Sequence, residues 1–295
     1  MSNIDYGPGG KPLPGQSQEK ASAKTAPELS RLIFFKAKPF PGVHMASGRY
    51  NEMSSFVETK IDKLEASDRV AFVKYNQNQM ARIYPKGARV DSSNYNPFKS
   101  WSYGCQMVAL NFQTSSESMW ANNAKFRDNG SAGYLLKPKY LLDPSYDFNP
   151  LVPRITGKRT LLLTITVISA RALPDATFKG SNLPGLITKK RKYNPFVNIK
   201  VKGIDADKSS FKTRAVRNNQ FDPIWDESFQ CSLLAPELAV VLIRIDVETK
   251  LKSARSCYAA IPVTCIRPGY RILKLRQQGK QLPYADLMCH FKLSI

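Results

Sequence analysis

The chain has 295 residues, of which 42% are hydrophobic, so it is long enough for about two ordinary domains with buried cores. Its 44 lysine and arginine residues against 23 aspartate and glutamate residues give a formal net charge of +21, which predicts an anionic partner, either a nucleic acid or an acidic membrane. The apolar runs are shorter than the roughly 20 residues of a bilayer-spanning helix. The N-terminus lacks the apolar core of a signal peptide, and the five cysteines have no CxxC spacing, so we expect an intracellular protein with reduced thiols.

Residues 1–28 are rich in glycine, proline, serine, lysine and glutamine and contain almost no large apolar side chain. Such a segment cannot bury enough apolar surface to offset the entropy lost on ordering. We interpret it as a flexible linker or tail.

Residues 29–143 alternate short apolar runs with stretches of helical periodicity. The predicted strands are 32–37, 80–84, 107–112 and 133–136. Runs that are apolar on successive residues are typical of parallel strands buried on both faces. Four strand-helix units in series predict an α/β fold with a parallel sheet, and four units make half of an eightfold TIM-type barrel.

Two capping boxes mark the expected starts of helices between these strands. Ser55 with Glu58 predicts a helix that continues through apolar positions at helical spacing. Thr114 with Glu117 predicts a second helix. Residues 97–101 open on a proline and suggest a helical turn.

A proline-rich linker is predicted at 144–158, and residues 159–295 have a different character. Eight segments of β-type sequence follow with turn residues between them, at 160–169, 195–202, 211–216, 228–233, 239–247, 257–264, 270–275 and 286–293. No helical period separates these segments, which predicts an all-β antiparallel sandwich.

Specific stretches of sequence carry a resemblance to a known family. In the first region they are NEMSSF at 51–56, RIYPKGARVDSSNYNP at 82–97, WSYGCQMVALNFQT at 101–114 and GYLLKP at 133–138. These closely resemble the Y half of the catalytic barrel of eukaryotic phosphoinositide-specific phospholipases C. The sandwich region resembles the C2 domain that follows in this family, through NPFVNIKVKG, RNNQFDPIWDESF and APELA.

The resemblance implies an activity, and it implies which half of the barrel carries the catalytic groups. The family hydrolyses phosphatidylinositol 4,5-bisphosphate to diacylglycerol and inositol trisphosphate, using two histidines and a bound calcium that belong to the X half of the barrel. The implied expectations are that this chain holds no catalytic residue, that an X half acts with it in cis or in trans, and that calcium is a cofactor of the complete enzyme. The chain alone is expected to be inactive.

Three substrate-binding positions of the family match positions of this sequence. The resemblance implies that Ser55 and Arg82 hold ring phosphates and that Tyr84 lies against the inositol ring. Arginine offers a fork of donors to phosphate oxygens, and barrel enzymes place such groups at the carboxyl ends of their strands. Without the family, Ser55 reads as a helix N-cap, Arg82 as a solvated charge and Tyr84 as a core residue.

The two histidines do not form a catalytic or metal-binding set. His44 falls in a predicted loop and His290 in the last predicted strand, without ligand spacing between them. We expect both to be structural or solvated, which leaves this chain without an evident agent for acid-base catalysis.

The C2 calcium site is expected to be degenerate. The connections at 171–193, 217–227 and 248–256 should leave the sandwich at one end, where calcium-dependent C2 domains cluster aspartates. The family's Asp-Pro pair is Asn194-Pro195 here, and Val247 and Thr249 stand at aligned ligand positions. We therefore expect weak calcium binding or none at this end.

The same connections are basic instead. The predicted membrane-binding residues are Lys189, Lys190, Arg191, Lys192, Lys250 and Lys252. Each basic residue near an anionic leaflet contributes about 1 kcal/mol, which predicts binding to acidic membranes without calcium. The other interpretation of the KKRK run is a solvated loop or a signal of the nuclear-import type.

The expected function is thus the headgroup-recognising and membrane-binding portion of a phosphoinositide phospholipase C, cytoplasmic and peripheral at the inner face of the plasma membrane. The alternative is a non-catalytic adaptor that binds phosphoinositides or acidic membranes. Nucleic-acid binding rests on the net charge alone, with no recognition motif, so we expect no nucleic-acid partner.

Overall fold

The computed structural model describes residues 26–44, 49–152, 155, 159–174, 193–248 and 254–295. The chain divides into two compact units, Met1–Lys36 and Ala37–Ile295. Among the described helices, none has both the length and the apolar character needed to span a bilayer. The predicted tail at 1–28 lies almost wholly outside the described residues.

The predicted strand at 32–37 is wrong for most of its length. The structure has a helix, α1 (Pro27–Leu32), followed by a strand of two residues, β1 (Lys36–Ala37). The helix opens on Pro27 with Glu28 in its first turn and ends with Arg31 in its last turn. Proline is favoured at the first helical position. An acidic residue near the start of a helix and a basic residue near its end interact favourably with the helix dipole, so the sequence favours a local helix here over a strand.

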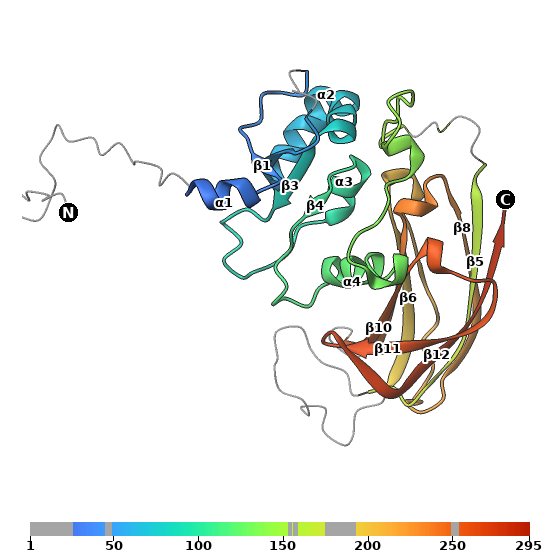
Figure 1. Cartoon of the computed structure of the whole chain (residues 1–295). Helices are drawn as coiled ribbons and strands as arrows, with labels where there is room; N and C mark the ends of the chain where they lie inside the picture. Colours follow the sequence, from blue (N-terminus) through green and yellow to red (C-terminus); the bar gives the residue numbers. More distant parts are fainter. Residues whose placement is uncertain (1–25, 45–48, 153–154, 156–158, 175–192, 249–253) are drawn as a thin grey trace, which may run out of the picture. The chain divides into compact units, whose positions relative to one another are not determined.

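A parallel sheet occupies the first part of the larger unit (Figure 1). Its strands are β2 (Glu52–Val57), β3 (Met80–Tyr84) and β4 (Met107–Val108), in the sheet order β1-β2-β3-β4. The helices α2 (Glu58–Asn78), α3 (Pro97–Ser102) and α4 (Glu117–Lys125) follow these three strands in turn. Parallel strands in sequential order, each followed by a helix, are the arrangement of a TIM-type barrel, so the predicted half barrel is confirmed.

The sheet has one covered face and one open face. Phe56, Ala81 and Ile83 are buried and share a core with Ile61 and Phe72 of α2. Side chains alternate between the faces of a strand, so the residues between these buried positions point away from α2. The helix itself is kinked at residue 68, where the backbone has φ −156° and ψ 83°.

Both predicted capping boxes are wrong. The helix α2 begins at Glu58 after Val57, and Ser55 lies inside β2 rather than at a helix cap. The helix α4 begins at Glu117, but the hydroxyl of Ser116, not that of Thr114, accepts from the backbone N–H of Met119 at 3.4 Å.

The predicted strand at 133–136 is not a strand in the structure. Tyr134 and Leu136 of this segment are 70% and 86% exposed. The segment is anchored after them, where the ammonium group of Lys137 donates to the backbone carbonyls of Asn76 at 2.6 Å and Gly104 at 3.1 Å. An apolar run becomes a strand only beside a strand to pair with, and the described sheet offers none here.

The second part of the chain is the predicted antiparallel sandwich. Its strands are β5 (Leu161–Arg171), β6 (Asn194–Lys202), β7 (Ser209–Lys212), β8 (Ile224–Leu233), β9 (Val240–Glu248), β10 (Ala254–Pro262), β11 (Gly269–Gln277) and β12 (Lys280–Ser294). They form one ladder in the order β7-β6-β9-β10-β11-β12-β5-β8. Each of the eight predicted segments overlaps a strand, although the segment 211–216 does so only at residues 211–212. The strands enclose one apolar core that includes Trp225.

Short 3-10 helices complete the described elements. They are η1 (Asn129–Ser131), η2 (Lys139–Leu141), η3 (Asp205–Asp207), η4 (Pro236–Leu238) and η5 (Val263–Cys265).

Helix α4 packs on strands β9 and β10 of the sandwich (Figure 1). The indole of Trp120 stacks on the ring of Tyr258 with centroids 3.8 Å apart and planes inclined by 11°. The Glu117 carboxylate forms ion pairs with Lys200 at 2.9 Å, Lys202 at 2.8 Å and Arg244 at 2.9 Å. The half barrel and the sandwich therefore share both an apolar and an ionic interface.

Candidate functional site

The register of the parallel sheet brings the predicted site residues together. Ser55 on β2 is the direct partner of Arg82 on β3, and Val57 is the partner of Tyr84. Arg82 and Tyr84 are two positions apart on one strand, so both point to the face opposite the helix. Ser55 and Arg82 are exposed, and Tyr84 is 39% exposed.

This arrangement suits a phosphorylated ring. A guanidinium group presents several N–H donors in a fixed fork that matches phosphate oxygens, and the hydroxyl of Ser55 adds a further donor beside it. Tyr84 lies at the carboxyl end of β3 and offers an aromatic face there. The carboxyl ends of the strands are where barrel enzymes hold their ligands.

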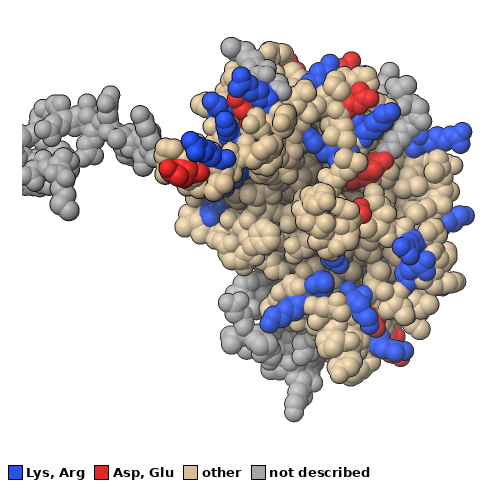
Figure 2. Space-filling view, in the orientation of Figure 1, with Lys and Arg blue, Asp and Glu red and all other residues tan. Residues whose placement is uncertain are grey.

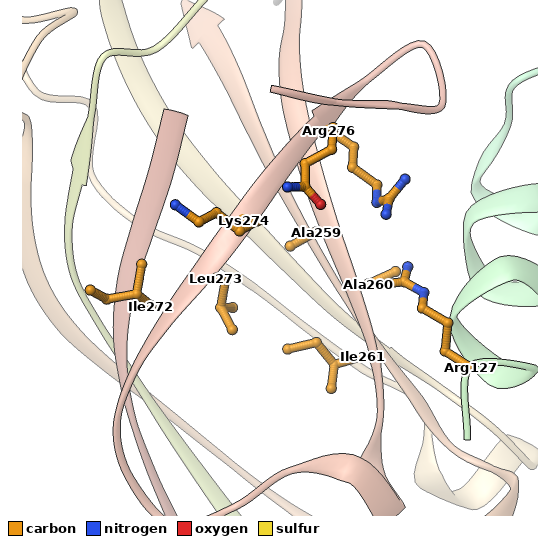
Figure 3. Close-up of a pocket in the computed structure, with 9 residues that line it drawn as sticks. Arg127, Ala259, Ala260, Ile261, Ile272, Leu273, Lys274 and Arg276 are labelled. Atoms are coloured by element: carbon orange, nitrogen blue, oxygen red, sulfur yellow. The ribbon is translucent and has the colours of Figure 1, made fainter. Parts of the chain in front are cut away.

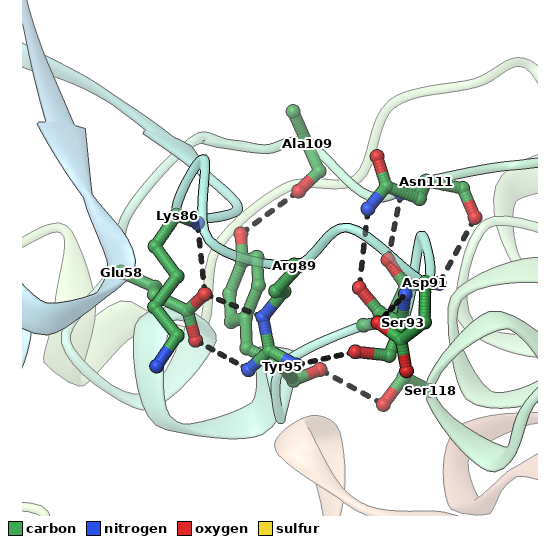
Figure 4. A network of polar contacts seen from close by, with 10 residues as sticks. Glu58, Lys86, Arg89, Asp91, Ser93, Tyr95, Ala109, Asn111 and Ser118 are labelled. Atoms are coloured by element: carbon green, nitrogen blue, oxygen red, sulfur yellow. Dashed lines mark hydrogen bonds and ion pairs between the residues drawn. The ribbon is translucent and has the colours of Figure 1, made fainter.

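The loop that follows β3 is fixed by an ion pair, drawn in Figure 4. Arg89 donates through Nε to Oε1 of Glu58 at 2.6 Å and through Nη2 to Oε2 at 2.7 Å. The backbone N–H of Lys86 donates to the same carboxylate at 2.9 Å. Glu58 begins α2, so this two-point contact ties the loop after β3 to the helix after β2.

The loop after β4 is tied to the loop after β3 by a second set of bonds, also visible in Figure 4. Asn94 donates its amide to the carbonyl of Asn111 at 2.9 Å and accepts from the N–H of Asn111 at 2.6 Å. The hydroxyl of Tyr95 donates to the carbonyl of Ala109 at 3.0 Å. Both loops at the carboxyl end of the sheet are thus held in place by hydrogen bonds within the chain.

The charge of Glu58 is stabilised by its neighbours. The hydrogen bond from Arg89 lowers the pKa of Glu58 below its usual 4.5, against the opposing effect of burial. Glu58 and Arg89 were missed as positioning residues in the sequence. The available signal was the place of Arg89 inside the RIYPKGARV stretch, in which only Arg82 and Tyr84 were given roles.

The two histidines lie apart from the site residues. His44 forms an ion-pair contact with Asp68 of α2 at 2.9 Å. The ring of His290 on β12 packs on Tyr270 of β11 with centroids 4.7 Å apart. Within the described residues, no group of three or more histidine, cysteine, aspartate or glutamate side chains could hold a metal ion.

The described ends of the three predicted connections lie at one end of the sandwich. Asn194 at the start of β6 is paired with Glu248 at the end of β9, and the Asn194 side chain accepts from the N–H of Asn218 at 2.9 Å. Val247, at an aligned ligand position, is only 2% exposed. The residues predicted to bind membranes, Lys189, Lys190, Arg191, Lys192, Lys250 and Lys252, lie outside the described residues, as do Asp175 and Thr249.

Comparison with known proteins assigns both parts of the chain. Residues 29–140 match the family "Phosphatidylinositol-specific phospholipase C, Y domain", and residues 161–266 match the C2 domain. The chain carries a phospholipase C Y domain followed by a C2 domain.

Several members of the phospholipase C family are similar over nearly the whole chain. A 1-phosphatidylinositol 4,5-bisphosphate phosphodiesterase of Dictyostelium discoideum is 38% identical over 94% of this chain, and the human delta-1 phosphodiesterase is 35% identical over 92%. The crystal structure of L. pealei PLC21 covers 92% of this chain with a TM-score of 0.79 and 34% identity. This chain spans about a third of each, namely 34%, 35% and 34% of their lengths.

Proposed function

We propose that this chain supplies headgroup recognition and membrane attachment to a phospholipase C that hydrolyses phosphatidylinositol 4,5-bisphosphate to diacylglycerol and inositol trisphosphate. The observation that carries the proposal is the register of β2 and β3, which sets Ser55 beside Arg82 with Tyr84 on the same face. Arg82 and Ser55 bind ring phosphates, and Tyr84 packs against the inositol ring.

The catalytic groups of the proposed reaction come from an X half. The site face of this chain presents a hydroxyl, a guanidinium and a phenol, which are not the hard, charged oxygens that calcium prefers. The nearby carboxylate of Glu58 is already engaged by Arg89 and Lys86. In the proposed enzyme, calcium and the proton-transferring histidines are therefore held by X-half residues facing this surface.

The open face and edge of the sheet support this need for another half. The strand β4 has two residues, and an open parallel sheet with exposed apolar neighbours is an association-prone arrangement. Phe112, which follows β4, is 70% exposed, and Val90 in the loop after β3 is 93% exposed. The X half, supplied in cis or in trans, would pair with this edge and cover the open face.

The C2 domain is proposed to attach the enzyme to acidic membranes without calcium. The support is the net charge of +21, with lysine and arginine side chains spread widely over the face shown in Figure 2. The basic connections add positive charge at the end of the sandwich where calcium-dependent C2 domains place carboxylates. The proposed location is the cytoplasm and the inner face of the plasma membrane.

A non-catalytic adaptor is the second candidate. The observation that favours it is the position of His44 and His290, which pair with Asp68 and Tyr270 rather than with the site residues. An adaptor would retain phosphoinositide and membrane binding without hydrolysis.

The test is a complementation assay on vesicles that contain phosphatidylinositol 4,5-bisphosphate. The chain is mixed with an X-half polypeptide of a relative, and release of inositol trisphosphate is measured with calcium present. We expect activity only in the mixture, and we expect Arg82→Gln to reduce it about tenfold or more, because one charge-assisted contact to phosphate is lost.

One control variant and a measurement of headgroup binding make the assay decisive. Arg267→Gln removes another exposed arginine, between β10 and β11 of the sandwich, and should leave the activity within about twofold of wild type. Headgroup binding that depends on Arg82, without activity in any mixture, would favour the adaptor. Headgroup binding unaffected by Arg82→Gln would contradict the proposed site in both functions.

A further inference from the structure

A pocket of about 160 Å³ lies between the end of the Y domain's last helix and the C2 domain (Figure 3). Its wall on the Y side is Arg127, which follows α4. The C2 side is formed by residues of β10, β11 and β12, namely Ala259, Ala260, Ile261, Ile272, Leu273, Lys274, Arg276 and Gln281. It is separate from the site on β2 and β3.

The pocket exists because two strands of the sandwich diverge. Tyr258 on β10 and Arg276 on β11 are the one pair in register between these strands, whereas β10 follows β9 over most of its length. After this pair the strands separate, and the backbone and the small side chains of Ala259 and Ala260 leave space between them.

Two arginines from different domains converge on this space. In Figure 3, Arg127 and Arg276 extend toward each other from the two sides of the pocket. Arg127 donates through Nε to the carbonyl of Asn123 at 3.1 Å, and Arg276 donates through Nη1 to the carbonyl of Gly279 at 3.1 Å. Each bond orients a guanidinium group and uses one of its five N–H donors.

The acidic residues near the pocket are engaged elsewhere. Asp286 pairs with Lys274 at 2.8 Å, and Asp128 accepts from the hydroxyl of Thr264 at 2.6 Å. Within the described ranges, neither Arg127 nor Arg276 is within 4.0 Å of a carboxylate. Among the described side chains, no carboxylate therefore pairs with either of the two guanidinium groups at the pocket.

The electrostatics of Arg127 agree with this geometry. Partial burial lowers the pKa of Arg127, and the neighbouring charge of Arg276 lowers it further. A bound anion would offset the repulsion between the two guanidinium groups, and an anion with two negative charges would offset it more than one with a single charge.

We propose that this pocket binds a phosphate group held between Arg127 of the Y domain and Arg276 of the C2 domain. Two guanidinium forks match the several oxygens of a phosphomonoester. A cavity of roughly 150 Å³ holds a molecule the size of benzene, so there is room for phosphate and part of the group that it esterifies. The apolar floor at Ile261 and Leu273 contacts that organic part.

The ligand bridges two domains, and its chemistry is shared by a soluble phosphate ester and a lipid headgroup. The first arm of the test is titration calorimetry of the whole chain with inorganic phosphate. We expect binding that Arg127→Gln and Arg276→Gln each weaken about tenfold, since each removes charge-assisted hydrogen bonds to the anion. Arg127→Lys and Arg276→Lys should retain part of the affinity.

Matched variants separate this site from other basic surfaces. Arg217→Gln removes one exposed positive charge and should change the affinity less than about twofold. Arg82→Gln removes the phosphate contact of the headgroup site, so the phosphate binding that persists in this variant reports the pocket alone and does not depend on the proposed function. Thermal melting without phosphate checks that each variant is folded.

The second arm compares vesicles containing phosphatidic acid with soluble inositol trisphosphate. Binding that depends on Arg127 and Arg276 in either arm supports the site and identifies the source of the phosphate group. Phosphate affinity that is unchanged in folded Arg127→Gln and Arg276→Gln chains, or that is lost equally in Arg82→Gln, would overturn the proposal.

Discussion

Arg82 and Arg89 belong to one stretch of sequence but have different environments. Arg82 is exposed on the open face of the sheet beside Ser55. Arg89 is held by two hydrogen bonds to Glu58. In the sequence, one arginine lies in the predicted strand 80–84 and the other follows it. Only the structure distinguishes Arg82, which is exposed on the open face, from Arg89, which fixes the loop.

Replacing Glu58 by glutamine should lower the free energy of unfolding by about 1–3 kcal/mol at pH 7, because Arg89 loses a charged, partly buried partner. Since the pKa of Glu58 is lowered in the folded chain, this stabilisation is present above pH 4.5 and is lost as the pH falls further. Urea unfolding of Glu58→Gln and wild type at pH 7 and at about pH 3 measures both effects.

The control is Asp62→Asn, on the same helix as Glu58, which alters an exposed ion pair with Lys99 of α3. It should change stability by at most about 1 kcal/mol. A Glu58→Gln effect no larger than that of Asp62→Asn would show that the contact to Arg89 does not fix the loop.

At the scale of elements, the C2 strands were predictable and part of the Y half was not. Strands of a sandwich have one buried face, so their alternation is visible in sequence, and all eight appear within a few residues of the predicted positions. The strand expected at 133–136 fails because its apolar pattern finds no neighbouring strand. The apolar pattern is a property of the segment alone, whereas formation of a strand also requires a neighbouring strand from another part of the chain.

The capping boxes failed for a related reason. Ser55 has the right spacing from Glu58 for a cap, but β2 extends to Val57 because it pairs with β3 along that length. Arg82 and Tyr84 were predicted as site residues by resemblance. Their juxtaposition with Ser55 required the register of the sheet, which no local pattern gives.

The helix α4 is joined to the sandwich through Glu117, and this contact predicts a pH dependence. Burial opposes ionisation, but hydrogen bonds from Lys202 and Lys200 prevail and lower the pKa of Glu117 from 4.5 to about 2. The contribution to stability is complete above pH 4.5 and is lost as the pH falls toward about 2. Glu117→Gln should reduce the free energy of unfolding by about 1–3 kcal/mol at neutral pH and make it less sensitive to acid.

Denaturant unfolding between pH 7 and about pH 3 checks this expectation for Glu117. The matched control is Glu227→Gln, which removes an ion pair with Arg214 inside the sandwich and should cost at most about 1 kcal/mol. Equal acid sensitivity of Glu117→Gln and wild type would contradict the proposed role of this ionic contact.

For the whole molecule, the proposed attachment to acidic membranes rests on the surplus of positive charge. We expect binding to vesicles to rise with their content of acidic lipid, to persist in the presence of a calcium chelator and to weaken with salt. One variant neutralises the basic run by combining Lys189→Gln, Lys190→Gln, Arg191→Gln and Lys192→Gln. It should weaken vesicle binding at least about tenfold, because each basic residue near the membrane contributes about 1 kcal/mol.

A control of equal charge comes from helix α2, by changing Lys60, Lys63, Arg69 and Lys74 to glutamine. Its effect should be smaller, at most about threefold, if the basic connection of the sandwich is the surface that meets the membrane. Sedimentation with vesicles measures both variants. Binding abolished by chelator, or reduced equally by the two variants, would contradict calcium-free attachment through the connection.

The contact between the two domains also changes where one folding module ends. Ile204, Ala235 and Leu238 belong to the sandwich by sequence, yet they are buried in the same cluster as Phe72 and Tyr103. Separating the two domains within the linker at 144–158 would expose buried apolar surface on both fragments. A truncated chain meant to isolate the C2 domain should therefore carry polar substitutions at these positions. Without them, we expect the fragment to aggregate.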